Sequence, residues 1–240
     1  MSSENWLGRT ELLIGKDGLA KLQKAHVLVV GLGGVGAYAA ENICRAGVGK
    51  MTIVDGDHLN PTNKNRQLPA VESTMGKPKA EVLGNRLLDI NPNLKLNIIQ
   101  EYIKDEKMIE VLNKPFDYVV DAIDTLSPKV FLIYHSLQKG LRIVSSLGAG
   151  GRLDPVKVTI NDISKSYNCR LGANLRKRLR RLGVTKGFKV VFSEDKWDEK
   201  AVISYEQEVN KKSTVGTISY MPPVFGCFCA SVVLRDLMGK

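Results

Sequence analysis

Hydrophobic positions along the chain fall into short continuous runs that alternate with longer segments in which apolar residues recur every three or four positions. Short apolar runs are typical of buried strands, and the wider spacing is typical of helices packed on a sheet. The pattern predicts strands at 26–30, 51–54, 96–100, 116–120, 142–146, 157–162 and 189–193. It predicts helices at 5–24, 35–46, 79–90, 105–112, 130–139 and 223–237. Because strands and helices alternate, we expect an α/β fold with a doubly wound, mainly parallel sheet and a closing C-terminal helix.

Glycines interrupt the chain directly after the first apolar run: Gly31, Gly33, Gly34 and Gly36. A tight glycine turn between a strand and a helix aims backbone N–H groups and the positive helix end at an anion. Asp55 ends the next apolar run, roughly 20 residues further on, where a carboxylate can accept the hydroxyls of a ribose. This half of the chain is Rossmann-like and should hold an adenine nucleotide. The glycine pattern is shared by nicotinamide, flavin and ATP users, and its glycines could instead only let the helix pack closely on the strand.

Polar and cationic residues gather beyond Asp55, where an open parallel sheet binds its ligand. Asn63 and Arg66 stand in the following loop, and Lys79 begins the helix expected at 79–90. A dinucleotide needs little side-chain charge, whereas a triphosphate needs extra positive charge as its leaving group develops. Lysine at a helix start also opposes the helix dipole, which favours a functional reason for Lys79. The Walker pattern is absent from the sequence, so these side chains would replace the lysine of a P-loop.

Two carboxylates, Asp121 and Asp124, follow the strand expected at 116–120. Carboxylates at the carboxyl end of a strand can coordinate Mg²⁺, which prefers oxygen ligands and bridges phosphates. One of the two could instead cap the helix that begins near Ser127 and Pro128. We expect that both roles apply.

Composition bounds the architecture. The 240 residues are 43% hydrophobic and 25% charged, which favours one sizeable core and one domain over 1–240. We expect a basic segment at 163–193 and a crossover segment at about 206–217 as insertions, the latter mobile and able to pass over a bound substrate. The sequence shows neither an apolar run of about 18 residues nor a leader, so we expect no transmembrane segment and a cytoplasmic location. Four scattered cysteines without a C-x-x-C pair argue against disulfides and zinc.

The net charge of +10 is concentrated in the basic segment. Between Asp162 and Glu194 the chain carries nine cations and no acid. Five of them form its densest part: Arg176, Lys177, Arg178, Arg180 and Arg181. Such a concentration attracts a polyanion, and the absence of aromatic residues within 176–181 favours contact with nucleic-acid phosphates over base stacking. The alternative is a solvated helix face.

Several short motifs carry a resemblance. They are G-L-G-G-V-G at 31–36, V-D-G-D at 54–57, N-x-x-R at 63–66, G-x-P-K at 76–79, D-A-I-D at 121–124 and R-T-E-L-L-I-G at 9–15. Together they resemble the adenylating family that includes the ubiquitin-activating enzymes and the bacterial activators of sulfur-carrier proteins. I-N-P at 90–92, G-A-G-G-R-L-D-P at 148–155 and the basic segment resemble one branch, the tRNA threonylcarbamoyladenosine dehydratases. The resemblance covers the chain from about Arg9 to its end.

The resemblance implies an ATP-dependent enzyme that cyclises N6-threonylcarbamoyladenosine, a modified adenosine beside the tRNA anticodon, by adenylating its carboxylate. It implies a homodimer, because Arg9 would reach the neighbouring subunit's nucleotide site. The catalytic residues would be Arg9, Arg66, Lys79 and Asp124, with Mg²⁺ on Asp124. The ATP contacts would be Gly31, Gly33, Gly34, Gly36, Asp55, Asp57, Asn63, Arg66, Lys79 and Asp124. The tRNA contacts would be Arg176, Lys177, Arg178, Arg180 and Arg181.

Two other functions stay open at this stage. The first is adenylation of the C-terminal glycine of a ubiquitin-like sulfur-carrier protein, against which the missing C-x-x-C pairs and the basic segment argue. The second is a nicotinamide-dependent reductase or a nucleotide-binding protein. Dehydratases of this branch can carry a cysteine in the crossover segment, which this chain lacks, and Cys227 and Cys229 are expected to be buried and inert. A sulfur-transfer protein partner, a monovalent ion, contact with a membrane surface and the choice of tRNA also stay open.

Overall fold

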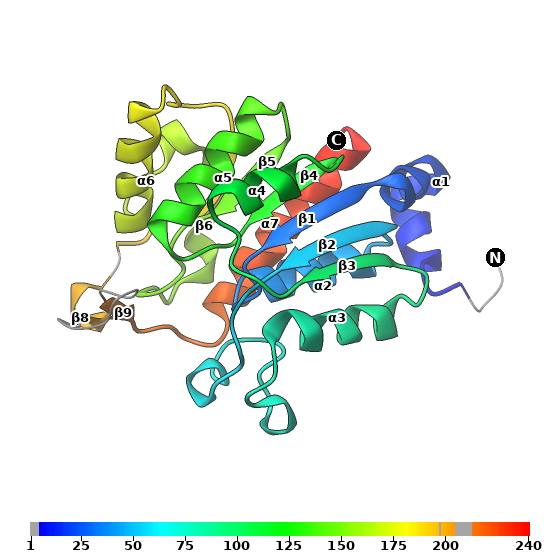
Figure 1. Cartoon of the computed structure of the whole chain (residues 1–240), viewed down its shortest axis with the longest axis horizontal. Helices are drawn as coiled ribbons and strands as arrows, with labels where there is room; N and C mark the ends of the chain where they lie inside the picture. The colour runs from blue at the N-terminus through cyan, green and yellow to red at the C-terminus, as the bar shows by residue number, and fades with distance from the viewer. Residues whose placement is uncertain (1–4, 197, 205–212) are drawn as a thin grey trace.

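A seven-stranded sheet forms the centre of the computed structural model, which describes residues 5–196, 198–204 and 213–240 (Figure 1). Its strand order is β3-β2-β1-β4-β5-β7-β6. The strands are β1 His26–Val30, β2 Lys50–Val54, β3 Lys95–Ile99, β4 Tyr118–Asp121, β5 Ile143–Ser146, β6 Val158–Asp162 and β7 Lys189–Ser193. Neighbours are parallel except β6, which pairs antiparallel with β7 at the edge. The order reverses between β1 and β4, and open sheets bind ligands at the carboxyl ends of the strands at such a point.

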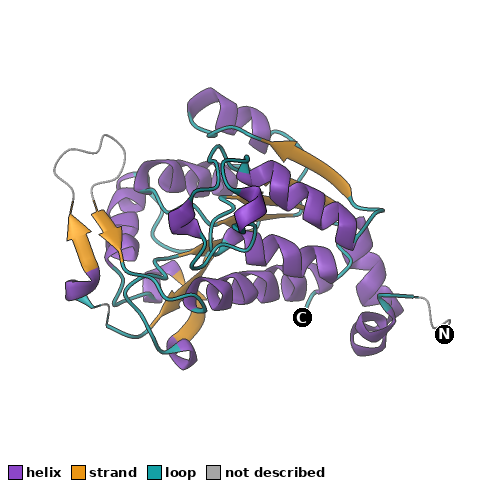
Figure 2. Ribbon diagram, turned by 90° about the horizontal axis from the view of Figure 1, so that it is seen from below, coloured by secondary structure: helices purple, strands orange, loops and turns teal. Residues whose placement is uncertain are grey.

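Helices cover both faces of the sheet, which lies between them in Figure 2. They are α1 Gly8–Lys24, α2 Gly36–Arg45, α3 Lys79–Ile90, α4 Asp105–Leu112, α5 Leu126–Gln138, α6 Arg170–Arg181 and α7 Met221–Met238. Helices α2, α3 and α7 share one apolar cluster, and α4, α5 and α6 share the other. Because successive strand side chains point to opposite faces, Val27 joins the first cluster and Leu28 the second. The doubly wound α/β prediction is confirmed.

The N-terminal helix differs from its prediction. Residues 5–7 are not helical, and the helix is interrupted at Gly15, where φ is +78°. Of the four leucines spaced for a helix, Leu19 and Leu22 are buried, whereas Leu12 and Leu13 are exposed. The interruption turns the first half of α1 out of register with the second, so the leucines do not form one buried stripe.

The segment after β5 contains elements that the apolar pattern did not predict. Helix α6, which was not predicted, occupies the basic segment, whereas the strand predicted at 189–193 is confirmed as β7, which lies inside the sheet between β5 and β6. Strands β8 (Val202–Ser204) and β9 (Ser213–Val215) pair antiparallel beyond it. The crossover predicted at 206–217 therefore begins with residues outside the described part of the chain, and its described end includes β9.

The closing helix α7 has the length and apolar composition to cross a membrane, alone among the described helices. Its packing identifies it as a core helix, since Phe225, Cys229 and Val233 are buried in the cluster with α2. Burial raises the pKa of the Cys229 thiol to about 12, in keeping with the inert role predicted for it. Cys227 is exposed on the same helix, so its predicted burial is wrong. Cys227 lies outside the stripe of α7 side chains that is buried in the core.

Candidate functional site

The glycine loop between β1 and α2 has no room for side chains at most of its glycines. Gly31 has φ of +86°, and a Cβ atom there would lie 2.8 Å from the carbonyl oxygen of Ala122. A Cβ at Gly36 would lie 1.7 Å from the carbonyl oxygen of Gly31, and one at Gly34 would lie 2.9 Å from the Cβ of Pro222. These three glycines therefore serve close packing as well as any ligand. Gly33 is the exception, because a Cβ atom there would lie 3.6 Å from its nearest neighbour, the Nε2 of Gln67.

Asp55, at the carboxyl end of β2, is tied to this loop. Its Oδ2 accepts a hydrogen bond from the backbone N–H of Leu32 at 2.6 Å, and its Oδ1 accepts one from the N–H of Asp57 at 2.8 Å. Burial raises the pKa of the Asp55 carboxyl, while the charge of Lys79 opposes that rise. The predicted ribose acceptor is thus held beside the glycines, half-buried and next to a cation.

Asp57 joins two side chains from different elements. Lys79 Nζ, at the start of α3, donates to Asp57 Oδ2 at 2.7 Å, and the hydroxyl of Tyr102 donates to Asp57 Oδ1. The backbone N–H of Lys79 also donates to the carbonyl of Asp57 at 3.0 Å. The lysine side chain is 7% exposed and the aspartate side chain 47% exposed, so one partner is fixed and the other faces solvent. This explains how a lysine is accommodated at a helix start.

Tyr102 was not predicted as a site residue. Its ring packs over Gly56, where a Cβ atom would come within 2.8 Å of the ring, and yet the residue is 68% exposed. The hydrogen bond to Asp57, followed by burial, raises the pKa of Tyr102 to about 12, and the charges of Asp55 and Asp124 act in the same direction. The phenol therefore remains a donor at neutral pH. Its only sequence signal is its place just after β3, at the carboxyl edge.

Arg66 and Asn63 belong to the loop after β2, which contains the short helix Pro61–Asn63. Arg66 donates from Nη1 to the carbonyl of Thr62 at 3.0 Å, and its Cγ lies 3.3 Å from where a Cβ of Gly34 would be. The arginine therefore lies along the glycine loop, and its contact with ATP stays a prediction. Asn63 is buried, and its Oδ1 accepts from the N–H of Asn60 at 3.1 Å. In this structure the Asn63 side chain stabilises the turn that carries Arg66.

Gln67 is a second side chain that sequence reasoning missed. It is 7% exposed, its amide lies beside Gly33, and its Oε1 has no hydrogen-bond partner among the described residues. A buried oxygen without a partner is costly unless a ligand or water supplies a donor. Its position directly after Arg66 was the available signal.

The two carboxylates after β4 have separate roles. Asp121 is fully buried, pairs with Lys129 Nζ at 2.8 Å and accepts from Ser145 Oγ at 2.6 Å. Helix α5 has Thr125 as its N-cap, without a side-chain cap. Asp121 therefore does not cap this helix, and its oxygens are already bonded by Lys129, Ser145 and the N–H of Ile123, whereas Mg²⁺ on Asp124 stays a prediction. Asp124 is exposed and close enough to Tyr102 to affect its pKa, so it faces the site from β4.

Candidate ligands for a metal are few at this edge. The described residues contain no group of three His, Cys, Asp or Glu side chains that could hold a metal ion. Asp124 alone offers an exposed carboxylate at the predicted place. A single carboxylate suits Mg²⁺, which commonly takes its other ligands from water and phosphate oxygens.

Arg9 lies far from these residues in its own chain. Helix α1 packs at the amino edge of the sheet, where Leu7 and Leu19 lie against Gly47, just before β2. Figure 1 shows α1 at the end of the sheet opposite to the strand arrowheads. Arg9 is exposed there, so the structure does not bring it together with Arg66 and Lys79 within one chain.

The predicted tRNA contacts lie together on α6. Leu175 and Leu179 of this helix are buried against α5 and the sheet. Arg176 is half-buried at the margin of that face. The remaining predicted cations are exposed: Lys177, Arg178, Arg180 and Arg181. Apolar anchoring on one side thus fixes a cationic surface on the other.

Several known proteins resemble this chain in sequence or in structure. The chain is 37% identical over 227 residues to a tRNA threonylcarbamoyladenosine dehydratase of Bacillus subtilis (strain 168), covering 93% of this chain and 88% of that protein. The crystal structure of the Escherichia coli tRNA N6-threonylcarbamoyladenosine dehydratase in complex with ATP superposes with a TM-score of 0.90 at 32% identity, over 100% of this chain and 98% of the other. The sulfur carrier protein ThiS adenylyltransferase of Escherichia coli is 31% identical over 142 residues, covering 58% of this chain and 56% of that protein.

The family assignment rests on nearly the whole chain. The model of the ThiF family matches residues 7–240, which span the glycine loop, the Asp57–Lys79 pair, α6 and α7. The dehydratases match this chain over almost its full length, including the basic segment, whereas the sulfur carrier adenylyltransferase matches little more than half. This chain belongs to the ThiF family.

Proposed function

We propose that this protein uses ATP to dehydrate N6-threonylcarbamoyladenosine in tRNA, closing a ring beside the anticodon. The observation that carries the proposal is the pairing of a nucleotide-type edge with a cationic surface in one chain. The edge holds the glycine loop, Asp55 and the Asp57–Lys79 pair, and the surface is α6. Its relatives over nearly the full length are named for this dehydration, and an ATP complex is known for one of them.

The first step is adenylation. An oxygen of the threonyl carboxylate attacks the α-phosphorus of ATP, forming an acyl-phosphate bond and breaking the bond to pyrophosphate. Negative charge grows on the departing pyrophosphate, so positioned cations accelerate the step. Arg66 lies along the glycine loop, and Lys79 is held at the same edge by Asp57. Both cations are therefore in place before a ligand arrives, which limits the reorganisation that the reaction needs.

The second step is ring closure. The carbamoyl group of the same substrate attacks the activated carbonyl carbon, AMP leaves with the carboxylate oxygen, and one proton is released. The net change in the nucleoside is the loss of one water molecule. This step needs no protein nucleophile, which agrees with a chain whose Cys229 is buried and whose exposed Cys227 lies on α7 rather than at the carboxyl edge.

Mg²⁺ fits the proposal through Asp124. The ion supplies positive charge that bridges phosphate oxygens when ATP is bound. The Asp124 carboxylate is exposed and lies on the same side of the sheet edge as Asp55 and Asp57. Asp121 is unsuited to this task because Lys129 and Ser145 contact its Oδ2 and the N–H of Ile123 donates to its Oδ1.

A homodimer would complete the site with Arg9. Trp6, just before α1, is 49% exposed, and in the first half of α1 Leu12 is 74% and Leu13 83% exposed, so a partner could cover these side chains. Contiguous exposed apolar side chains mark interaction surfaces. Because Arg9 lies at the amino edge of its own chain, it could serve only a neighbour's carboxyl edge.

Mixing two inactive variants tests this arrangement. Arg9→Ala and Lys79→Ala are each expected to lose activity, because each removes a cation from every site. In a mixture that exchanges subunits, one site in each heterodimer regains both residues, so activity should return. A mixture as inactive as its components, with subunit exchange verified by a tag, would place Arg9 outside the partner's site.

Mass spectrometry of nucleosides tests the reaction itself. tRNA that carries N6-threonylcarbamoyladenosine is incubated with the protein, ATP and Mg²⁺, then digested to nucleosides. We expect a mass loss of one water in that nucleoside, accompanied by AMP and pyrophosphate and abolished by Lys79→Ala. An unchanged nucleoside, together with pyrophosphate exchange that requires a carrier protein ending in glycine, would instead support the sulfur-carrier alternative. Tight NAD binding without ATP binding would support a nicotinamide-dependent enzyme.

The cytoplasm is the proposed location, since tRNA and ATP are both available there. Helix α7 does not argue against this, because its apolar side chains are used in the core. Fractionation of cells that express the tagged protein would test it, and recovery in the membrane fraction after a salt wash would contradict it.

A further inference from the structure

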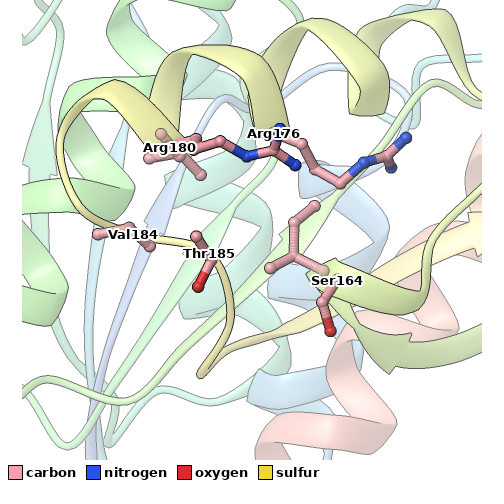
Figure 3. A pocket seen from close by; sticks show the side chains of 7 residues that line it. Ser164, Arg176, Arg180, Val184 and Thr185 are labelled. Carbon is pink, nitrogen blue, oxygen red and sulfur yellow. The ribbon is translucent and has the colours of Figure 1, made fainter.

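A cavity of about 210 Å³ opens beside α6, away from the glycine loop (Figure 3). We call it the α6 pocket, and seven residues line it: Ile163, Ser164, Arg176, Leu179, Arg180, Val184 and Thr185. Arg176 and Arg180 project from the helix, and Ser164 and Thr185 come from the segments on either side of it (Figure 3). The pocket therefore combines an apolar floor with a cationic rim.

The two arginines are available to a ligand. One turn of helix separates them, so their guanidinium groups lie on the same side of α6. Arg176 donates from Nη1 to Ser166 Oγ, which holds its side chain at the pocket. Within the described part of the chain, the Arg180 guanidinium has no hydrogen-bond or ion-pair partner. A fixed arginine next to an unpaired one is suited to an anion, and the guanidinium fork matches the oxygens of a phosphate or a carboxylate.

The opposite side of the pocket disfavours an anion. Ser164 donates from its hydroxyl to Asp162 Oδ1 at 2.6 Å, and Asp162 Oδ2 accepts from the N–H of Gly187 at 2.8 Å. The Asp162 carboxylate thus lies behind Ser164 and would repel a phosphate there. Ile163, Leu179 and Val184 make the floor between the two sides apolar. An occupant should carry negative charge at the arginines and an uncharged portion over the apolar floor.

We propose that the α6 pocket binds one unpaired ribonucleotide of the tRNA, with its phosphate on Arg176 and Arg180 and its base on the apolar floor. That the nucleic acid is tRNA rests on the proposed function. Proteins recognise RNA chiefly at unpaired nucleotides, whose bases can be extruded and stacked on apolar side chains or guanidinium planes. Double-helical RNA keeps its bases stacked inside, so it could use the arginines but not the floor.

The position of the pocket separates this nucleotide from the one that reacts. In the register of the sheet, Asp162 at the end of β6 lies opposite Lys189, the first residue of β7. The pocket, which follows Asp162, therefore lies near the amino edge of the sheet. The adenylation site is at the carboxyl edge, and a five-residue strand spans about 17 Å. The bound nucleotide is therefore a second one, remote from the modified adenosine, and the pocket would orient the tRNA rather than take part in the chemistry.

Binding measurements without ATP test the pocket independently of the dehydration reaction. The probes are unmodified tRNA, a short oligouridine and a fully paired RNA duplex of similar length. Val184→Met fills the floor without changing charge, and we expect it to weaken binding of tRNA and oligouridine about tenfold, with the salt dependence unchanged. Binding of the duplex should stay within about twofold of the parent protein's. Thr185→Met, at an exposed position where folding is not at risk, should have the same effect in smaller degree.

The arginines provide the second half of the test. Arg180→Ala should weaken binding of tRNA, oligouridine and duplex and reduce the salt slope by about one phosphate contact. Arg178→Ala removes a matched charge from the same helix outside the pocket and should leave the preference for oligouridine over duplex intact. If Val184→Met and Thr185→Met bind all three RNAs as the parent does, the pocket is empty in the complex and α6 acts only as a charged surface. Loss of dehydration with normal binding would count against the proposed function and leave the pocket standing.

Discussion

Two lysine–aspartate pairs lie at the carboxyl edge of the sheet, and they have nearly the same N–O distance but differ in burial and in their other hydrogen bonds. Lys79 Nζ and Asp57 Oδ2 are 2.7 Å apart, and Lys129 Nζ and Asp121 Oδ2 are 2.8 Å apart. In the first pair the aspartate side chain is 47% exposed, whereas both side chains of the second are fully buried. Distance alone therefore does not distinguish a pair that can meet a ligand from a pair that holds the fold together.

The surrounding hydrogen bonds account for the difference. Lys129 also donates to the carbonyl of Ile123 at 2.8 Å, and Asp121 accepts from Ser145, so the buried pair fixes the loop that carries Asp124. Asp57 instead shares its second oxygen with Tyr102, which is exposed. The buried pair is closed on all sides, and the other can exchange a partner for a phosphate. We infer that the Lys129–Asp121 pair supports the site and that the Lys79–Asp57 pair meets the ligand.

The largest effect should come from breaking the buried pair. Lys129→Ala leaves the Asp121 carboxylate without its counter-charge in the core, and removal of one partner of such a pair typically costs about 3–5 kcal/mol. We expect a loss of that size in the free energy of unfolding, measured by chemical denaturation. Lys64→Ala is the matched control, because its pair with Glu72 is exposed to solvent and should contribute little to stability. A Lys129→Ala protein as stable as the control would contradict the contrast between the pairs.

The next effect should be on turnover. Lys79→Ala and Arg66→Ala each remove a cation that stabilises developing charge, so we expect kcat to fall about a hundredfold or more. Lys77→Ala removes an exposed charge two residues earlier and should leave kcat within about twofold of the parent. Release of pyrophosphate from ATP and modified tRNA is the measurement. Turnover of either site variant near that of Lys77→Ala would remove the residue from the adenylation site.

The charge of Lys79 should also set the pH below which ATP affinity is lost. Burial raises the pKa of Asp55, and the charge of Lys79 opposes that rise. If ionised Asp55 accepts the ribose hydroxyls, ATP affinity falls as pH drops through this raised pKa. Lys79→Gln removes the opposing charge, so the pKa rises further and the fall begins at higher pH. ATP titrations over an acidic to neutral series should show that displacement, and Lys77→Gln should follow the parent; identical profiles for all three would refute it.

How far the sequence could predict these features depends on whether a residue belongs to a repeating or recognisable pattern. The glycine loop, Asp55 and Lys79 could be predicted because strand, turn and helix signals stand next to them. Lys129 could not, since a lysine just before a predicted helix is normally solvated, and only the fold shows that it points at Asp121. Helix α6 was hidden because its two buried leucines are outnumbered by cations, although they suffice to anchor it.

Tyr102 shows the same limit within the site. An isolated tyrosine in a loop carries no periodic signal, and its partner Asp57 lies 45 residues away in sequence. The sheet brings them together because β2 and β3 are neighbours with their carboxyl ends side by side. Long-range contacts of this kind follow from topology and not from local pattern, so sequence reasoning placed the Lys79 side of the pair and missed the tyrosine.

The smallest expected effect is that of Tyr102→Phe, and it tests whether Asp57 really exchanges partners. The Tyr102 hydroxyl donates to one Asp57 oxygen while Lys79 donates to the other. Without the phenol, Asp57 attracts Lys79 more strongly, so the lysine is less available to the leaving pyrophosphate. One such hydrogen bond is worth about 0.5–1.5 kcal/mol, so kcat should fall roughly three- to tenfold.

Separate measurement of kcat and of the KM for ATP distinguishes the two ways in which Tyr102 could act. If Tyr102 acts through Lys79, the loss should fall on kcat and vanish in a Lys79→Ala background, because the two residues then belong to one coupled unit. Tyr220→Phe is the matched control, since its hydroxyl donates to the carbonyl of Leu153 at 2.8 Å, away from Asp57. A loss confined to the KM for ATP, or one that persists without Lys79, would mean that Tyr102 contacts the nucleotide directly. Asp57 would then be a fixed support for Lys79, and the exposed pair would resemble the buried one more closely than its solvent exposure suggests.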